Sequence, residues 1–150
     1  MRRLLFLLTV LLIASTSFSQ SPAKKKIVLI PGHDSHGLGE HEHLGGCIML
    51  AKWLNANVPD ANAVITEQGW PKDTTILDNA SAIVMYSDGG DSHMAIPHLA
   101  HLDRLMNKGV GLLNLHYAVE VPKGEAGDDF KKWVGGYFES YWSVNPFWSA

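Results

Sequence analysis

The sequence predicts a single α/β domain, built on a parallel sheet with helices on both faces. Its 150 residues suit one domain. Short apolar runs alternate along the chain with segments in which apolar residues recur at helical spacing. The first run, residues 27–30, has no polar interruption, which is typical of a strand buried on both faces of a parallel sheet. Regular alternation of this kind places helices on both faces of such a sheet.

The apolar runs predict four strands. In the first run three of the four residues are β-branched, and Pro31-Gly32 ends it. The last run contains Gly111 and leads directly to His116. We expect strands over residues 27–30, 62–66, 82–86 and 110–115.

Helical segments follow each predicted strand. The clearest has Leu99, Leu102 and Leu105 on one helical face, and Gly109 is a typical C-terminal stop. We expect helices over residues 46–55, 73–79, 97–107 and 128–138. Ligands of such sheets bind outside the carboxyl ends of the strands, which selects the loops at 31–45, 87–93 and 116–125.

The N-terminus has the three parts of a secretory signal peptide. Met1-Arg2-Arg3 is basic, residues 4–14 are almost wholly apolar, and Ser17 and Ser19 are small. We expect residues 1–19 to be a signal peptide, residues 20–26 a leader, and the protein to be periplasmic or secreted. An uncleaved membrane anchor is the alternative, but the apolar run is shorter than the roughly 20 residues of a membrane span, so no stable membrane anchor is expected.

The charge of the chain argues against nucleic acid as a partner. Without residues 1–19, ten Lys and Arg stand against fifteen Asp and Glu, a net charge of −5, and no basic stripe remains. The single cysteine, Cys47, excludes an internal disulfide and is expected to be a small buried group. A homo-oligomer is compatible with these features.

The end of the chain is rich in aromatic residues. Residues 137–150 include three tyrosine or phenylalanine side chains followed by Trp142, Phe147 and Trp148. Chain termini are usually polar. We therefore expect the domain, residues 27–150, to be incomplete at its C-terminus.

The loop after the first strand concentrates histidine and glutamate. His33, His36, His41, Glu40 and Glu42 lie within eleven residues, and intervening glycines allow tight turns. Imidazole and carboxylate are the usual ligands of zinc and similar ions, so His36 and His41 are candidate ligands of a divalent metal such as zinc. The spacing matches no established zinc motif, and a solvated polar loop is the alternative.

His116 follows the fourth strand directly. A residue at a sharp strand-to-helix turn projects into the site, as in a nucleophile elbow. His116 could act as a general base, bind a metal or donate to a sugar hydroxyl, or it could only cap the following helix. Tyr117 is adjacent, and Glu120 lies one helical turn further, where it could orient His116.

The loop after the third strand reads Ser87-Asp88-Gly89-Gly90. Paired glycines permit close approach of a ligand, and Asp88 could bind sugar hydroxyls. Asp and Gly are equally typical of ordinary turns. Both interpretations stay open on the sequence alone.

Together these motifs resemble the ThuA-like (trehalose utilisation) family. The resemblance covers residues 26–150. It rests on residues 36–42 (HGLGEHE), 86–90 (YSDGG), 111–120 (GLLNLHYAVE), 133–138 (WVGGYF) and 142–146 (WSVNP).

The resemblance implies a flavodoxin-like fold of the class I glutamine amidotransferase-like superfamily. The nucleophilic cysteine of true amidotransferases is replaced at the elbow by His116, so glutaminase chemistry is not expected. The family implies a role in the breakdown of trehalose or related glycosides, on a sugar or keto-sugar.

Two hypotheses follow. In the first, the protein is a hydrolase or lyase with His116, Glu40 and Glu42 as catalytic residues. His33, Asp88, Tyr117 and Glu120 would then bind the substrate, and His36 and His41 would bind a metal. In the second, it is a non-catalytic carbohydrate-binding module whose sugar would stack on aromatic residues, namely Trp133, Tyr137, Tyr141, Trp142 and Trp148.

Overall fold

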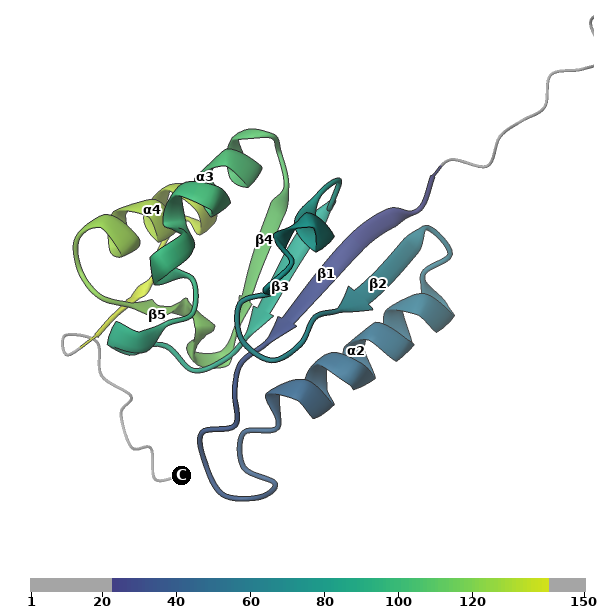
Figure 1. Ribbon diagram of the computed structural model, residues 1–150, viewed down its shortest axis with the longest axis horizontal. Helices are drawn as coiled ribbons and strands as arrows, with labels where there is room; N and C mark the ends of the chain where they lie inside the picture. Colours follow the sequence, from purple (N-terminus) through teal and green to yellow (C-terminus); the bar gives the residue numbers. More distant parts are fainter. Residues whose placement is uncertain (1–22, 141–150) are drawn as a thin grey trace, which may run out of the picture.

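The computed structural model describes residues 23–140, and it confirms the α/β class. Its main sheet has four parallel strands in the order β2-β1-β3-β4 (Figure 1). The strands are β1 (Lys25–Pro31), β2 (Ala61–Ile65), β3 (Ala82–Tyr86) and β4 (Gly111–Leu115). A second, two-stranded parallel sheet joins β5 (Glu120–Val121) and β6 (Phe138–Glu139), which the apolar runs did not predict.

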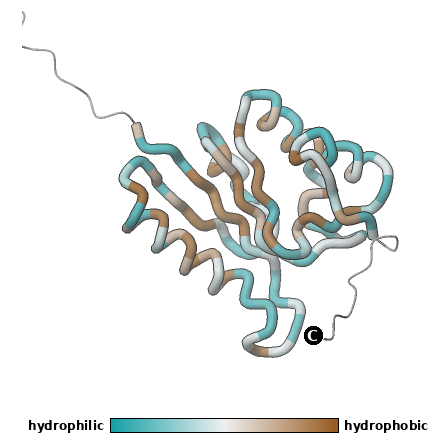
Figure 2. Tube along the Cα trace, turned by 180° about the vertical axis from the view of Figure 1, so that it is seen from behind, coloured by the Kyte–Doolittle hydropathy of each residue, from teal (hydrophilic) through white to brown (hydrophobic). Residues whose placement is uncertain are grey.

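The strands β1 and β3 are the inner strands of the main sheet. Val28 of β1 is in register with Val64 of β2 on one side and with Ile83 of β3 on the other. Val28 and the two residues after it are fully buried, as the uninterrupted apolar run predicts. Figure 2 shows hydrophobic residues along the middle strands and a mostly hydrophilic loop after β1.

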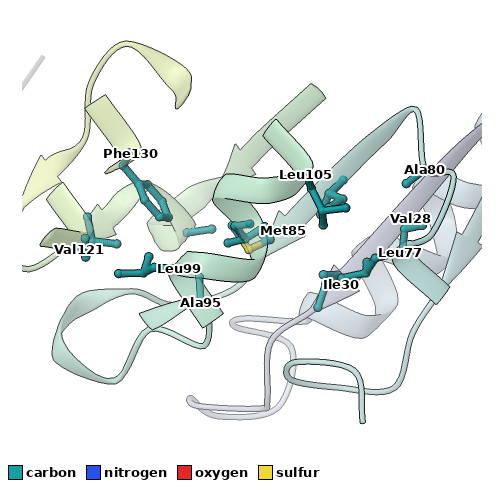
Figure 3. Close-up of a cluster of buried hydrophobic side chains, with 14 residues drawn as sticks. Val28, Ile30, Leu77, Ala80, Met85, Ala95, Leu99, Leu105, Val121 and Phe130 are labelled. Atoms are coloured by element: carbon teal, nitrogen blue, oxygen red, sulfur yellow. The ribbon is translucent and has the colours of Figure 1, made fainter. Parts of the chain in front are cut away.

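Helices cover both faces of the sheet (Figure 1). On one face α2 (His43–Asn57) packs Cys47 and Ala51 against Leu29 and Val84. On the other face lie α3 (Leu99–Asn107) and α4 (Glu125–Val134). The larger core cluster lies between these two helices and the sheet, and it includes Val28, Met85, Leu99 and Phe130 (Figure 3).

Several predicted boundaries were wrong. The strand β1 begins at Lys25, inside the expected leader, because Lys25 and Lys26 pair with β2. The helix α2 begins at His43 rather than at residue 46. The last helix spans Glu125–Val134 rather than 128–138, because Gly135 ends it in the left-handed conformation (φ +86°). The expected helix at 73–79 is a short 3-10 helix, Thr74–Leu77, capped by Asp73.

The carboxyl ends of β1, β3 and β4 lie at one edge of the sheet. After β3 the chain forms two 3-10 helices, Gly90–Ser92 and Ile96–His98, and after β4 a third, His116–Val119. The order β2-β1-β3-β4 reverses direction between β1 and β3, and ligand sites of open α/β sheets lie at such a reversal.

Two predictions fall on the parts of the chain outside residues 23–140. They are the signal peptide at 1–19 and the aromatic residues Tyr141, Trp142 and Trp148. Within residues 23–140, no helix combines the length and the apolar character that crossing a membrane requires.

Candidate functional site

The three predicted loops meet at one point. His41 Nδ1, from the loop after β1, lies 3.1 Å from Asp88 Oδ1, in the loop after β3. His41 Nε2 lies 3.3 Å from Nε2 of His116, at the end of β4. These residues, with His36 and His43, form what we call the histidine cluster.

Asp88 is the acidic centre of the histidine cluster. Besides His41, Nε2 of His43 lies 3.8 Å from Asp88 Oδ1, and Nδ1 of His36 lies 4.0 Å from Asp88 Oδ2. Partial burial alone would raise the pKa of Asp88. Hydrogen bonds from Ser35 and His41 and the charges of the nearby imidazoles outweigh burial, so the pKa is lowered. Asp88 is therefore ionised at neutral pH and only accepts, which makes His41 Nδ1 the donor.

His43 was not among the expected site residues. Its side chain is fully buried. Nδ1 lies 3.1 Å from the carbonyl oxygen of His33, which can only accept, so Nδ1 carries a proton. In the neutral ring Nε2 then holds a lone pair, and this buried atom has no hydrogen-bond partner in the part of the chain that the structure describes. No signal in the sequence pointed to this role, because residue 43 was expected in the loop before the helix.

His116 has the backbone conformation of an elbow. Its φ is +58°, a left-handed value that is uncommon for residues other than glycine and is often found at functional sites. Burial and the charge of His41 lower the pKa of His116. The ring is therefore mainly neutral at pH 7, as a general base requires.

The two glutamates of the loop after β1 accept hydrogen bonds from the backbone of the same loop. Glu40 Oε2 accepts from the backbone N–H of Gly37 at 2.9 Å, and Glu42 Oε1 accepts from that of Gly39 at 2.8 Å. Both side chains are exposed. Each carboxylate thus fastens a turn of the loop that carries His41.

Of the other residues expected to bind substrate, Tyr117 adjoins the histidine cluster, whereas Glu120 has no hydrogen bond to it in the described part of the chain. The Tyr117 ring lies 4.4 Å from the His116 ring, centre to centre. The His33 ring lies against Gly69. Glu120 is part of β5 and does not continue a helix from His116, and across residues 23–140 no hydrogen bond joins its carboxylate to His116.

A cavity of about 300 Å³ adjoins the histidine cluster. Asp88 belongs to its wall, so the cavity and the cluster share this residue. Loops that follow β1 and β3 supply most of the wall, and Gly69 and Met94 complete it. We call this space the side cavity.

Two of the aromatic residues considered for sugar stacking have structural contacts. Trp133 Nε1 donates to Asp103 at 3.1 Å, and the Tyr137 hydroxyl donates to Glu139 at 3.0 Å. Both rings also pack against the larger core cluster. Cys47 is buried, as expected, and burial raises the pKa of its thiol to about 11, so it is no nucleophile.

The donor set of the histidine cluster fits a divalent metal. His36, His41 and Asp88 each offer one ligand atom, and these atoms lie within 4.8 Å of one another. Imidazole and carboxylate together suit zinc and neighbouring divalent ions. Comparison of the chain with protein-family models, with curated proteins and with solved structures finds no match.

Proposed function

We propose that this protein acts on a carbohydrate, a trehalose-related glycoside or keto-sugar, by proton transfer at the histidine cluster. One observation carries the proposal: three loops separated by up to 75 residues bring His41, Asp88 and His116 into hydrogen-bonding distance. The sugar is inferred from the resemblance of the sequence to the ThuA-like family. On the same ground we propose a flavodoxin-like, class I glutamine amidotransferase-like fold and no glutaminase activity. Export from the cytoplasm is proposed from the signal-peptide pattern of residues 1–19.

Asp88 and His41 form an acid–base pair. The carboxylate fixes the imidazole with its proton on Nδ1, so that Nε2 is free to accept a proton. His116 Nε2 lies 3.3 Å from that atom and can pass a proton to it. By way of His116, the pair can therefore take a proton from a substrate hydroxyl, or from a carbon next to a sugar carbonyl, and return it by the same route to a leaving oxygen.

As an alternative to this proton transfer, a divalent metal such as zinc would be held by His36, His41 and Asp88, and His41 would then serve as a ligand instead of a base. When bound, it would polarise a carbonyl or hydroxyl of the sugar. His43 Nε2, buried 3.8 Å from Asp88, would add a further lone pair to the same site.

There is one alternative for the catalytic base and one for the function as a whole. Glu40 or Glu42 could supply the base in place of His41. A non-catalytic carbohydrate-binding module is the second candidate, and the engagement of Trp133 and Tyr137 within the fold counts against it.

The test is turnover of trehalose and of its keto derivatives by the full chain, followed by proton NMR. We expect His41→Ala and Asp88→Asn to lower kcat/KM at least 100-fold, the lower end of what general acid–base catalysis contributes. His101→Ala is the matched control, because His101 packs near Trp70, outside the cluster. Glu40→Gln and Glu42→Gln compare the alternative bases. Sugar binding without turnover would leave the binding module as the function.

A further inference from the structure

The side cavity is a small space whose wall carries several polar side chains beside a larger area of carbon atoms. Its wall includes the side chains of Asp34, Ser35, Ser87, Asp88 and Ser92. A volume of about 300 Å³ is at the lower end of the range for ligand sites. Such a space suits one small polar molecule rather than a chain of sugar units.

Ser87 is the group in this wall that lacks a partner. The residue is 4% exposed, and its hydroxyl has no hydrogen-bond partner in the part of the molecule that the structure describes. Buried hydroxyls are nearly always hydrogen-bonded, because an unpaired one loses its bonds to water without replacement. Ser87 also belongs to the wall of the side cavity, so a ligand hydroxyl that reaches its Oγ would restore that bond.

The backbone holds Ser87 in this place. A Cβ atom at Gly32 would lie 2.5 Å from Cβ of Ser87, so glycine at position 32 allows the loops after β1 and β3 to pack together. Asp34, in the opposite loop, is held by a 2.8 Å hydrogen bond from Gln68 Nε2 to its Oδ1. Both polar groups are therefore positioned before any ligand arrives.

The charge of the wall selects among polar ligands. Asp34 and Asp88 are acidic, and no Lys or Arg is among the described residues that line the side cavity. A phosphate would meet two carboxylates, with a single histidine, His33, as the basic side chain of the described wall, and carboxylates only accept hydrogen bonds. Neutral hydroxyl groups can donate to both carboxylates and pair with the hydroxyl of Ser87.

We propose that the side cavity is a subsite for one unphosphorylated sugar ring, in which Ser87 is the specificity-determining hydrogen-bond partner and Asp34 excludes sugar phosphates. The proposal rests on the proposed function for the class of ligand, a sugar. Asp88 belongs both to the wall of the side cavity and to the histidine cluster. A sugar ring bound in the side cavity therefore lies next to His41 and His43.

Calorimetric titration of the full chain with D-glucose and with D-glucose 6-phosphate tests the subsite. We expect glucose to bind at least tenfold more tightly than its phosphate. Ser87→Ala should weaken glucose binding roughly fivefold, in the range of one hydrogen bond, without lowering Tm, because it removes an unpartnered group. The control is Ser81→Ala, at an exposed position directly before β3, which should change neither the glucose affinity nor Tm.

Asp34→Asn should narrow the preference for glucose over its phosphate, and Asp60→Asn, on an exposed turn, should not. The subsite is refuted if glucose does not bind, if its phosphate binds as well, or if Ser87→Ala binds glucose like the wild type. Failure of the proposed function gives a different pattern: glucose binding that depends on Ser87, with no sugar turnover that depends on His41.

Discussion

Nδ1 of His43 donates a hydrogen bond to the backbone oxygen of His33, over 3.1 Å. This bond fixes the tautomer of a fully buried ring, so the lone pair of Nε2 lies 3.8 Å from the Asp88 carboxylate. An imidazole lone pair that faces a partly exposed carboxylate at this distance favours a cation between them. A ring nitrogen that donates to a backbone carbonyl, with the other nitrogen facing the ion, is the usual arrangement of metal-binding histidine.

We predict that His43→Phe lowers zinc affinity at least tenfold, as the loss of an orienting or binding group does at other metal sites. Phenylalanine keeps a ring of similar size in the buried position. Zinc binding to the full chain is measured by calorimetric titration. His101→Phe serves as the control, and equal zinc affinity in His43→Phe and wild type would contradict the prediction.

We predict that His116→Gly abolishes turnover while the free energy of unfolding stays within about 1 kcal/mol of wild type. A left-handed φ costs a side-chain-bearing residue about 1–2 kcal/mol, which glycine avoids, and this gain offsets the greater flexibility of glycine in the unfolded chain. Urea denaturation measures stability beside the turnover assay. A large loss of stability would show that His116 serves the fold instead.

Stability should fall as the pH drops below about 6.5, in part because of His93. This buried ring uses both nitrogens: Nδ1 accepts from the N–H of Ala95, and Nε2 donates to the carbonyl of Ala118. Burial lowers its pKa in the folded protein, more than the hydrogen bond to Ala118 raises it. The unfolded chain therefore binds the proton first, and stability is lost between the unfolded pKa and the lower folded one.

For one such group the loss is at most about 1.4 kcal/mol per pH unit. Urea denaturation at pH 7.5 and pH 5.5 measures it, and His93→Gln should show a smaller difference between the two pH values than wild type. His98 and His116 also have lowered pKa values, so both proteins should keep part of the effect. An NMR titration that gave His93 an ordinary pKa would be inconsistent with this account.

We predict that Gly89→Ala destabilises the fold by about 1–3 kcal/mol. A Cβ atom there would overlap the backbone carbonyl oxygens of Tyr117 and Glu120. Gly136→Ala is the matched control, because a Cβ there meets nothing within 4 Å. Thermal unfolding measures Tm for both variants. Similar Tm values would contradict the close packing of residue 89 against the backbone of Tyr117 and Glu120.

The sheet and the meeting of three loops could be predicted from the sequence. Uninterrupted apolar runs mark buried parallel strands, and the carboxyl ends of such strands share an edge, so the loops that carry Asp88 and His116 were both selected for the ligand site. The predicted ends of helices and strands were wrong where the backbone conformation of one residue ends the element. Gly135 is an example, because its left-handed φ ends a helix that the apolar spacing would continue.

The roles of individual side chains in the loop after β1 could not be predicted. Glycine-rich loops have no periodicity, so nothing in the sequence distinguishes His43, which is buried, from His36, which is exposed. Glu40 and Glu42 have the composition of a catalytic pair, but their carboxylates accept from backbone N–H groups three residues away. Such local bonds depend on the path of the loop, which pairs His41 with partners 47 and 75 residues distant.

The contact of Gly89 with the backbone of Tyr117 and Glu120 joins two of the three loops into one wall. Neither of these two loops can be lengthened or reshaped without displacing the other. At the tip of the loop after β1, Leu38 is fully exposed, whereas the neighbouring Gly39 has a left-handed φ of +83° that favours glycine. Variation that alters substrate choice while preserving the fold should therefore accumulate at residue 38, and directed evolution of new sugar preferences would best begin there.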